Sequence, residues 1–121
     1  MESKFKNKNF KESLIRAFNG LWIGFKRERN LKIYFIGALV SIPLNLYLHF
    51  SLLEHVVYAM CAIGVISSEY LNTAIEILCD HVQLEYEESI KKAKDVAAAG
   101  VVCWGLLFSV AELAMVIRHF V

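Results

Sequence analysis

Three long apolar segments dominate this chain and restrict the ways in which it can fold. They cover residues 31–48, 52–73 and 96–117. Each is long enough to cross about 30 Å of hydrocarbon as a helix. Pro43 and Asn45, near the end of the first segment, are expected either to kink that helix or to end it. The segments predict an all-α integral membrane protein with three transmembrane helices.

Composition agrees with a single membrane-embedded domain over residues 1–121. Hydrophobic residues make up 57% of the chain and charged residues 21%, and the charges are segregated from the apolar segments. The net charge of +1 argues against a nucleic-acid partner. Cys61, Cys79 and Cys103 are odd in number and lie in apolar segments, so we predict reduced packing residues and no disulfide framework.

The distribution of basic residues predicts the orientation of the chain in the membrane. Of the 13 Lys and Arg residues, nine precede or open the first span: Lys4, Lys6, Lys8, Lys11, Arg16, Lys26, Arg27, Arg29 and Lys32. Lys91, Lys92 and Lys94 lie between the second and third spans, and the turn between the first two spans has none. The positive-inside rule then places the N-terminus and the second loop in the cytoplasm.

An amphipathic helix is predicted over residues 10–28, before the first span. Its apolar residues recur at helical spacing: Phe10, Leu14, Phe18, Leu21, Trp22 and Phe25. Basic and polar residues fill most of the gaps, as is typical of a helix lying on a membrane surface. Two interpretations stand, a simple anchor or a helix that also covers an active site. Glu28, which ends the helix among basic residues, favours the second.

A stripe of polar residues lies at the cytoplasmic end of the second span. At about 100° per residue, a helix places Glu69, Asn72, Glu76 and Asp80 within about 80° of one another. Ionisable groups at bilayer depth cost roughly 3 kcal/mol each and are treated as functional by default. Carboxylates beside a carboxamide suit a divalent cation and a phosphate ligand. The stripe indicates an enzyme rather than an inert anchor.

The second loop supplies a further candidate for phosphate binding. Lys94 and Asp95 sit directly against the third span, where they can face the end of the second. Lys94 could hold a phosphate as a point charge or could simply extend its ammonium to the membrane interface. The chain has no Gly-x-x-x-x-Gly-Lys phosphate loop, no Gly-x-Gly-x-x-Gly and no His-Arg-Asp, so the common soluble nucleotide-binding classes are disfavoured.

These motifs together resemble the prokaryotic diacylglycerol kinase and undecaprenol kinase family of small membrane enzymes. The matching pieces run from about Phe10 to the C-terminus. They are residues 13–20 (SLIRAFNG), 28–30 (ERN), 69–76 (EYLNTAIE) with Asp80, and 94–98 (KDVAA). The pattern Glu-x-x-Asn-x-Ala-Ile-Glu-x-x-x-Asp is highly specific in a three-span protein of this length.

The resemblance implies a homotrimer in the bacterial cytoplasmic membrane, with active sites shared between neighbouring subunits. It implies transfer of the γ-phosphoryl group of MgATP to the hydroxyl of a membrane lipid. Glu28 and Glu76 would hold Mg²⁺ and contact ATP, and Glu69 would act as the general base. Further implied ATP contacts are Asn72, Asp80, Glu85, Tyr86, Lys94 and Asp95. Implied lipid contacts are Leu14, Ala17, Glu69 and Ala98.

The sequence also departs from the family pattern. Glu87 occupies the place after the loop tyrosine where members often have His, and Asn9 stands where some members have a basic residue. Glu112 within the third span is unexpected. It could extend to the far interface, pair with His119, or touch a lipid headgroup.

The identity of the acceptor lipid is the open question at the level of sequence. Residues 28–30 and the Glu69-x-x-Asn72-Thr73 pattern look like the Gram-positive branch of the family, in which undecaprenol is the usual acceptor. Diacylglycerol is the alternative, since both lipids present one hydroxyl at the same interface. A small non-enzymatic membrane subunit is the remaining class, although such a subunit has no need of the polar stripe.

Overall fold

The computed structural model describes residues 6–82, 85 and 87–121. Over this part of the chain it contains four helices and no strand: α1 (Phe10–Arg27), α2 (Arg29–Tyr47), α3 (Leu52–Val82) and α4 (Glu88–Arg118). The all-α prediction is therefore confirmed.

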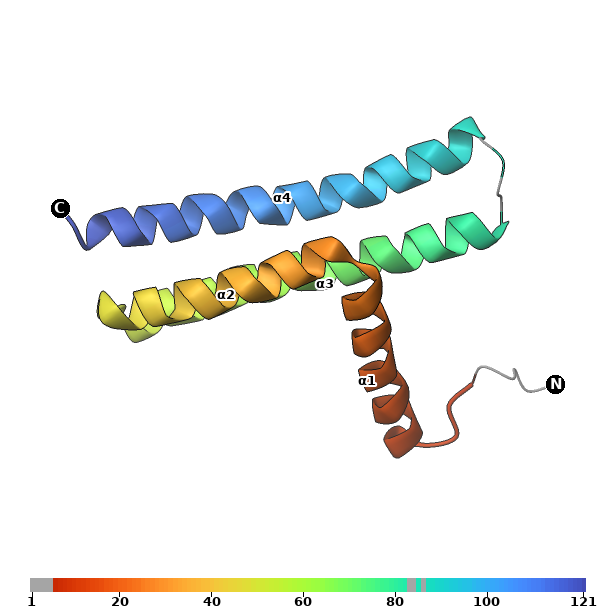
Figure 1. The fold of residues 1–121 in the computed structure, drawn as a ribbon, viewed down its shortest axis with the longest axis horizontal. Coiled ribbons are helices and arrows are strands. Elements are labelled where there is room, and N and C mark those ends of the chain that lie inside the picture. Colours follow the sequence, from red (N-terminus) through yellow and green to blue (C-terminus); the bar gives the residue numbers. More distant parts are fainter. Residues whose placement is uncertain (1–5, 83–84, 86) are drawn as a thin grey trace.

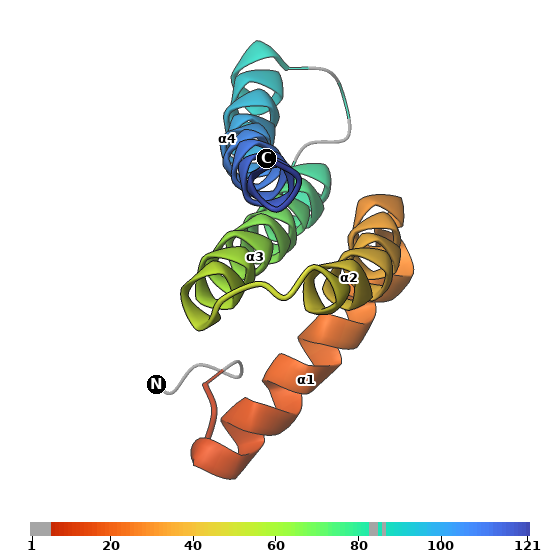
Figure 2. The same ribbon diagram turned by 90° about the vertical axis from the view of Figure 1, so that its left-hand side faces the viewer.

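The helices form an elongated bundle with one helix turned away from it. Helices α2, α3 and α4 run nearly along one axis, and α1 projects from the start of α2 at a wide angle (Figure 1). Seen from the end, α3 lies between α4 and α2 (Figure 2). Its most extensive contact is with α4. This arrangement leaves α1 beside the middle part of α3, close to the polar stripe.

Helix α1 begins and ends close to the predicted limits. The side chain of Asn9 caps it by accepting a hydrogen bond from the Glu12 backbone N–H at 2.9 Å. The helix ends where Glu28 adopts an extended conformation, with φ −103° and ψ 119°. Phe10 and Phe18 are 78% and 66% exposed, so the apolar face has little protein to pack on. An exposed apolar face of this kind suits the surface of a membrane.

Helix α2 corresponds to the first predicted span, with one difference. It continues through Pro43 to Tyr47, so Pro43 does not end it. The following turn is tight, and His49 takes a positive φ of 58° there. The backbone N–H of Ser51 then donates to the Glu54 carboxylate at 2.8 Å, and the Ser51 hydroxyl accepts from the Glu54 N–H at 3.2 Å, which secures the start of α3.

Helices α3 and α4 extend beyond the predicted spans at the end nearer α1. Each has 31 residues and is long and apolar enough to cross a membrane. Helix α3 carries the polar stripe on the turns that follow its apolar part. Helix α2 is not one of these two helices, so the first predicted span, residues 31–48, stays a prediction.

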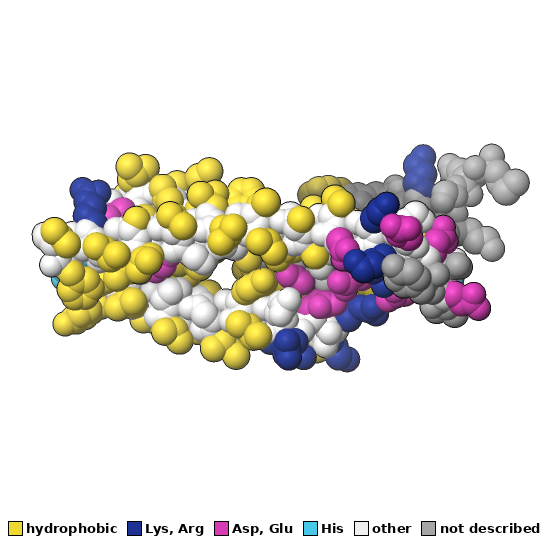
Figure 3. Space-filling view, turned by 90° about the horizontal axis from the view of Figure 1, so that it is seen from above, with side chains coloured by type: hydrophobic (Ala, Val, Ile, Leu, Met, Phe, Trp, Pro, Cys, Tyr) yellow, Lys and Arg dark blue, Asp and Glu magenta, His cyan; other side chains and the backbone are white. Residues whose placement is uncertain are grey.

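Apolar side chains cover the outside of the bundle. No described residue of α4 is buried, and Leu106 and Val110 are 63% and 65% exposed. Figure 3 shows hydrophobic side chains along most of one face, with acidic and basic side chains gathered toward one end. Patches of this extent are typical of surfaces that contact lipid or other subunits. Cys61 and Cys79 are buried, as predicted for packing residues, whereas Cys103 is exposed; all three are free.

Glu112 has a partner that the sequence did not indicate. The Asn45 Nδ2 donates to its Oε2 at 3.4 Å, linking α2 to α4. His119 lies instead beside Glu54, with its Nε2 3.2 Å from the carboxylate. Pairing of Glu112 with His119 is therefore wrong, because the start of α3 lies nearer to the imidazole.

Candidate active site

The polar stripe of α3 forms one side of a buried cluster. Glu69 is 2% exposed and Asn72 is 7% exposed. The Asn72 Nδ2 donates to the Glu76 Oε1 at 3.3 Å, across one turn of the helix. The Thr73 hydroxyl donates to the backbone carbonyl of Glu69 at 2.9 Å, so its proton is not donated to the Glu69 carboxylate. The helical spacing therefore aligns the stripe as predicted.

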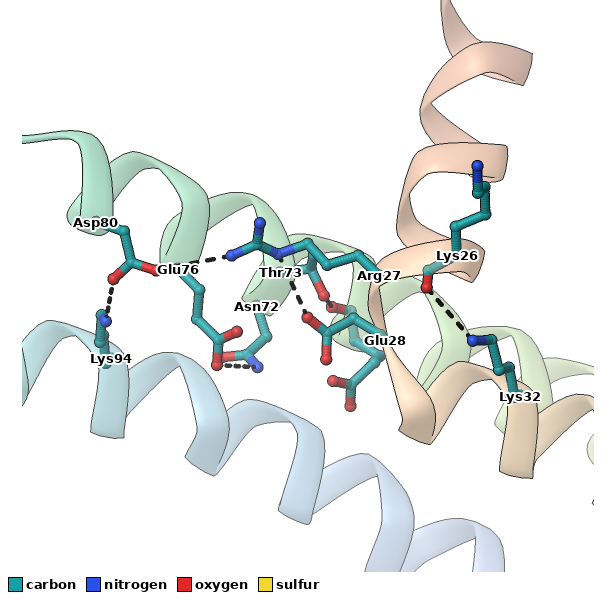
Figure 4. A network of polar contacts seen from close by, with 10 residues as sticks. Lys26, Arg27, Glu28, Lys32, Asn72, Thr73, Glu76, Asp80 and Lys94 are labelled. Carbon is teal, nitrogen blue, oxygen red and sulfur yellow. Dashed lines mark hydrogen bonds and ion pairs between the residues drawn. The ribbon is translucent and has the colours of Figure 1, made fainter.

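The junction between α1 and α2 brings Glu28 to this stripe. Its extended backbone lets the chain change direction there, and its backbone N–H donates to the Gly24 carbonyl at 2.9 Å. The side chains of Glu28, Asn72 and Glu76 extend toward one another from neighbouring elements (Figure 4). Glu28 and Glu76 both lie close enough to Glu69 for the charges to interact. Three carboxylates separated in sequence thus converge.

A cavity of about 290 Å³ opens beside Glu69 and Asn72. Asn30 and Tyr34 line it from α2, and both lie close enough to interact with the Glu69 carboxylate. Ala98 lines it from α4. Glu69, the predicted general base, therefore shares one cavity with the predicted nucleotide contact Asn72 and the predicted lipid contact Ala98. This cavity lies between α2, α3 and α4.

An ionic cluster lies beyond the cavity, at the end of α3. The Lys94 ammonium donates to the Asp80 carboxylate, and the Arg27 guanidinium lies 3.6 Å from the same group. These residues lie outside the apolar segments. The hydrogen bond from Lys94 and the charge of Arg27 hold the pKa of Asp80 below its usual value, and the same bond raises the pKa of Lys94. Both groups are charged at neutral pH.

Several predicted site residues do not lie at this cluster in the structure of the single chain. Asp95 is exposed, and its carboxylate pairs with Lys91 at 2.6 Å. Glu85 is exposed in the loop. Leu14 and Ala17 are exposed on α1 and do not line the cavity beside Glu69. Tyr86 lies outside the described residues.

One atom of the cluster favours a bound cation. The Asn72 Oδ1 is buried and has no hydrogen-bond partner among the described residues. A buried carbonyl oxygen without a partner is costly, and oxygen ligands of this kind suit Mg²⁺. In the described part of the chain no group of three or more His, Cys, Asp or Glu side chains stands in a ready-made metal geometry. The donor set therefore fits an ion that also takes oxygens from its substrate, as Mg²⁺ does with nucleotide phosphates.

Sequence reasoning gave no role to Asn30, Tyr34 or Arg27. Asn30 stood in the quoted motif of residues 28–30, and Tyr34 follows it by four residues, so a helix places both on one face. From that spacing, the sequence could have predicted that Asn30 and Tyr34 line the same cavity. Arg27 carried no such signal, because its contact with Asp80 depends on how α1 meets α3.

Comparison with known proteins places the chain in a family. Residues 16–117 match the family model described as prokaryotic diacylglycerol kinase. The undecaprenol kinase of Bacillus subtilis (strain 168) is 34% identical over 94 residues, which cover 78% of this chain and 76% of that protein. The diacylglycerol kinase of Haemophilus influenzae (strain ATCC 51907 / DSM 11121 / KW20 / Rd) is 29% identical over 101 residues, covering 76% of this chain and 86% of that protein.

The family match spans all four helices and includes Glu28, the whole α3 stripe and Lys94. The match therefore covers the cavity as well as the apolar segments around it. This chain belongs to the prokaryotic diacylglycerol kinase family, a family of lipid kinases.

Proposed function

We propose that this protein transfers the γ-phosphoryl group of MgATP to the hydroxyl of a membrane lipid, with undecaprenol as the acceptor. The observation that carries the proposal is the convergence of Glu28, Glu69 and Glu76 on Asn72, whose buried Oδ1 has no partner among the described residues. Phosphoryl transfer depends mainly on positioning and charge neutralisation, and such a cluster can supply both.

Glu28 and Glu76 are the proposed Mg²⁺ ligands, and Asn72 orients Glu76 through their hydrogen bond. When bound, Mg²⁺ neutralises charge that develops on the phosphate oxygens. Glu28 lies at the junction of α1 and α2 and Glu76 lies in α3, so the site depends on how α1 docks against α3. Two carboxylates plus substrate phosphates form a common Mg²⁺ site, and removal of either carboxylate would weaken the binding of the ion.

Glu69 is the proposed general base. It lies in the cavity nearer the apolar part of α3 than Glu76 does, where the hydroxyl of a lipid can reach it. Its carboxylate accepts the hydroxyl proton, the lipid oxygen bonds to the γ-phosphorus, and the bond to the bridging oxygen of ADP breaks. Asn30 and Tyr34 hold the carboxylate in place from α2. A positioned base of this kind contributes about 10²–10⁴-fold to a rate.

The nucleotide is proposed to bind between the stripe and the loop that joins α3 to α4. Lys94 presents its ammonium at the end of α3, where it neutralises Asp80 and can serve as a point charge for phosphate. Asp80, Glu85, Tyr86 and Asp95 are assigned to the nucleotide through the family pattern. Within one subunit Asp95 faces Lys91 and away from the cavity, so its contact would require a rearrangement or a neighbouring subunit.

The proposed setting is a homotrimer in the bacterial cytoplasmic membrane, with α1 on the cytoplasmic surface and α2, α3 and α4 spanning. The largely exposed apolar faces of α4 support burial by lipid and by other subunits. The charge asymmetry supports the orientation, since nine of the 13 Lys and Arg residues precede or open the first predicted span and three lie between the second and third.

A single-cysteine labelling experiment tests this orientation. In a background without the three native cysteines, Tyr47→Cys should react with an impermeant thiol reagent in intact cells, because Tyr47 is 79% exposed next to the turn. Lys8→Cys and Lys92→Cys should react only after permeabilisation. The reverse pattern would separate the stripe from cytoplasmic ATP and contradict the kinase proposal.

Undecaprenol is preferred as the acceptor because the undecaprenol kinase of Bacillus subtilis is 34% identical to this chain, against 29% for the diacylglycerol kinase of Haemophilus influenzae. Residues 28–30 and the pattern from Glu69 to Thr73 point the same way. Diacylglycerol is the second candidate, and the name of the matching family, prokaryotic diacylglycerol kinase, favours it.

The deciding assay uses the purified full chain in mixed micelles with γ-labelled ATP. Undecaprenol and diacylglycerol are offered separately and then in competition. Faster label transfer to undecaprenol is the expected result, and a preference for diacylglycerol would overturn the choice of acceptor. Transfer to neither lipid, with the assembly intact, would favour a non-enzymatic membrane subunit.

A further inference from the structure

Tyr70 joins the surface helix to the bundle through two contacts. Its hydroxyl donates to the backbone carbonyl of Leu21 at 2.7 Å, linking residues 49 positions apart in the chain. Its ring lies directly against Gly24, the one buried residue of α1. A Cβ atom at Gly24 would overlap that ring, so the close approach of the two helices requires glycine there.

This contact is linked to Glu28 by one backbone bond. The carbonyl of Gly24 accepts the hydrogen bond from the Glu28 N–H at 2.9 Å, where α1 ends. Tyr70 therefore holds the last turn of α1, and the last turn of α1 holds Glu28. On α3, Tyr70 directly follows Glu69, but about 100° of rotation directs it to a different face of the helix.

A second contact between the end of α1 and α3 is an ion pair, and it is weaker. The Arg27 guanidinium lies 3.6 Å from the Asp80 carboxylate, and both side chains are nearly half exposed. Exposed ion pairs contribute little to stability. The contacts of Tyr70 with Leu21 and Gly24 are thus the more specific attachment between α1 and α3.

We propose that Tyr70 and Gly24 form a positioning contact that sets Glu28 beside Glu76. Neither residue touches the reacting groups; they act by fixing where α1 ends relative to the α3 stripe. The inference rests on the proposed role of Glu28 and Glu76 as Mg²⁺ ligands. It extends that role, because it makes docking of the surface helix a condition for metal affinity.

The simplest test removes only the hydroxyl. Tyr70→Phe keeps the ring against Gly24 and loses the bond to Leu21, so the free Mg²⁺ concentration for half-maximal activity should rise about three- to tenfold, the range expected for one hydrogen bond. The kcat at saturating Mg²⁺ should stay near that of the unmodified protein. The KM for the lipid should stay unchanged. These are measured with the full chain in mixed micelles, varying Mg²⁺ and lipid separately, and the Mg²⁺ affinity is also measured without turnover by calorimetric titration of Mg²⁺ into the protein with a non-hydrolysable ATP analogue.

A second pair of variants tests the close approach. Gly24→Ala should raise the Mg²⁺ requirement about tenfold or more, because the new methyl group displaces the ring of Tyr70. Gly20→Ala is the matched control, since it lies one turn earlier on α1 with nothing within 4 Å of its Cβ position. It should leave the Mg²⁺ requirement unchanged. Replacing the ring in Gly24→Ala/Tyr70→Leu should recover part of the loss, a non-additivity expected of residues in contact.

The outcomes separate this inference from the function on which it rests. An unchanged Mg²⁺ requirement in both Tyr70→Phe and Gly24→Ala, with Glu76→Gln inactive, overturns the positioning role and leaves the metal assignment in place. A raised lipid KM with normal Mg²⁺ dependence also overturns it, because Tyr70 then belongs to the apolar cavity lined by Phe18, Trp22 and Phe35. Full activity in Glu76→Gln overturns the metal assignment itself.

Discussion

The two ends of this bundle both bury acidic and amide side chains, yet the two sets of contacts differ. At the end near α1, Glu69 and Asn72 face a cavity of about 290 Å³, and charges from Glu28 and Glu76 act on Glu69. At the opposite end, the Glu54 carboxylate accepts from the Ser51 backbone N–H and lies 3.2 Å from His119. At the end near α1, three carboxylates gather and the Arg27 guanidinium lies 3.8 Å from one of them, Glu28, whereas at the opposite end the Glu54 carboxylate already has its partners.

The end with Glu54, called the closed end below, also contains the contact between Asn45 and Glu112, in which two oxygen atoms lack a hydrogen-bond donor within the described part of the chain. Asn45 Oδ1 and Glu112 Oε1 are both buried without a partner among the described residues, while Asn45 Nδ2 donates to the other Glu112 oxygen. A proton on Glu112 would supply the missing donor and join both atoms in a reciprocal pair. An isolated acidic residue in an apolar span can therefore be explained by packing between helices, whereas three neighbouring carboxylates repel one another and are stabilised by positive charge placed among them.

The largest expected effect on activity is at the end near α1, which contains the cavity beside Glu69. Glu76→Gln should abolish kinase turnover while the protein still assembles in membranes, because the neutral amide lacks the negative charge that the carboxylate contributes to Mg²⁺ binding. Glu28→Gln should raise the Mg²⁺ requirement severely. Initial rates at increasing Mg²⁺ measure both. Glu88→Gln is a suitable control, since Glu88 is an exposed residue of α4 paired with Lys92; near-normal rates in Glu76→Gln at ordinary Mg²⁺ contradict the assignment.

The next effect separates the base from the ligands. Glu69→Gln should lower kcat by about 10²–10⁴-fold. The apparent KM values for MgATP and lipid should change little, because an interaction made only in the transition state is lost. Steady-state kinetics with each substrate varied in turn measure this. A raised KM for MgATP with kcat intact would make Glu69 a nucleotide or metal ligand, and Asp95 would be the next candidate for the base.

A smaller effect is expected at the closed end, on stability rather than on chemistry. Glu112→Gln should be nearly neutral, because its amide can donate to Asn45 Oδ1 and accept from Nδ2. Glu112→Ala should cost about 1–3 kcal/mol, since it leaves both polar atoms of Asn45 buried and unpaired. Thermal unfolding in detergent compares the two, and activity per folded protein should persist in both. Loss of turnover in a folded Glu112→Gln protein would show that the two ends are not functionally separate.

The smallest effect on stability is expected at Asp80. Its partners Lys94 and Arg27 are partly exposed, with side-chain exposures of 36% and 45%. Asp80→Asn should therefore change the free energy of unfolding by no more than about 1 kcal/mol, and less at high salt. The KM for MgATP should rise if Asp80 helps to orient Lys94 for phosphate. Unfolding at two salt concentrations and MgATP titrations measure these two effects separately.

The sequence alone determined the helices and the composition of each face. The length of the apolar segments predicted that α3 and α4 are long enough to cross a membrane. The helical spacing of apolar residues predicted the amphipathic α1, and the spacing of polar residues predicted that Glu69, Asn72 and Glu76 align. These features depend on local geometry, because about 3.6 residues per turn place the residues of one helix relative to each other without reference to any other helix. The motif formed by the same residues indicated a family of lipid kinases.

Only the tertiary structure decided which faces of different helices meet. The approach of Gly24 to Tyr70, the lining of the Glu69 cavity by Asn30 and Tyr34, and the pairing of Asn45 with Glu112 all join separate helices. Such contacts depend on crossing angle, rotation and axial position, and a pattern within one helix does not set any of these. The convergence of Glu28 on the α3 stripe is of this second kind, because it requires a chain that turns at Glu28 and a surface helix docked closely enough for glycine to touch an aromatic ring.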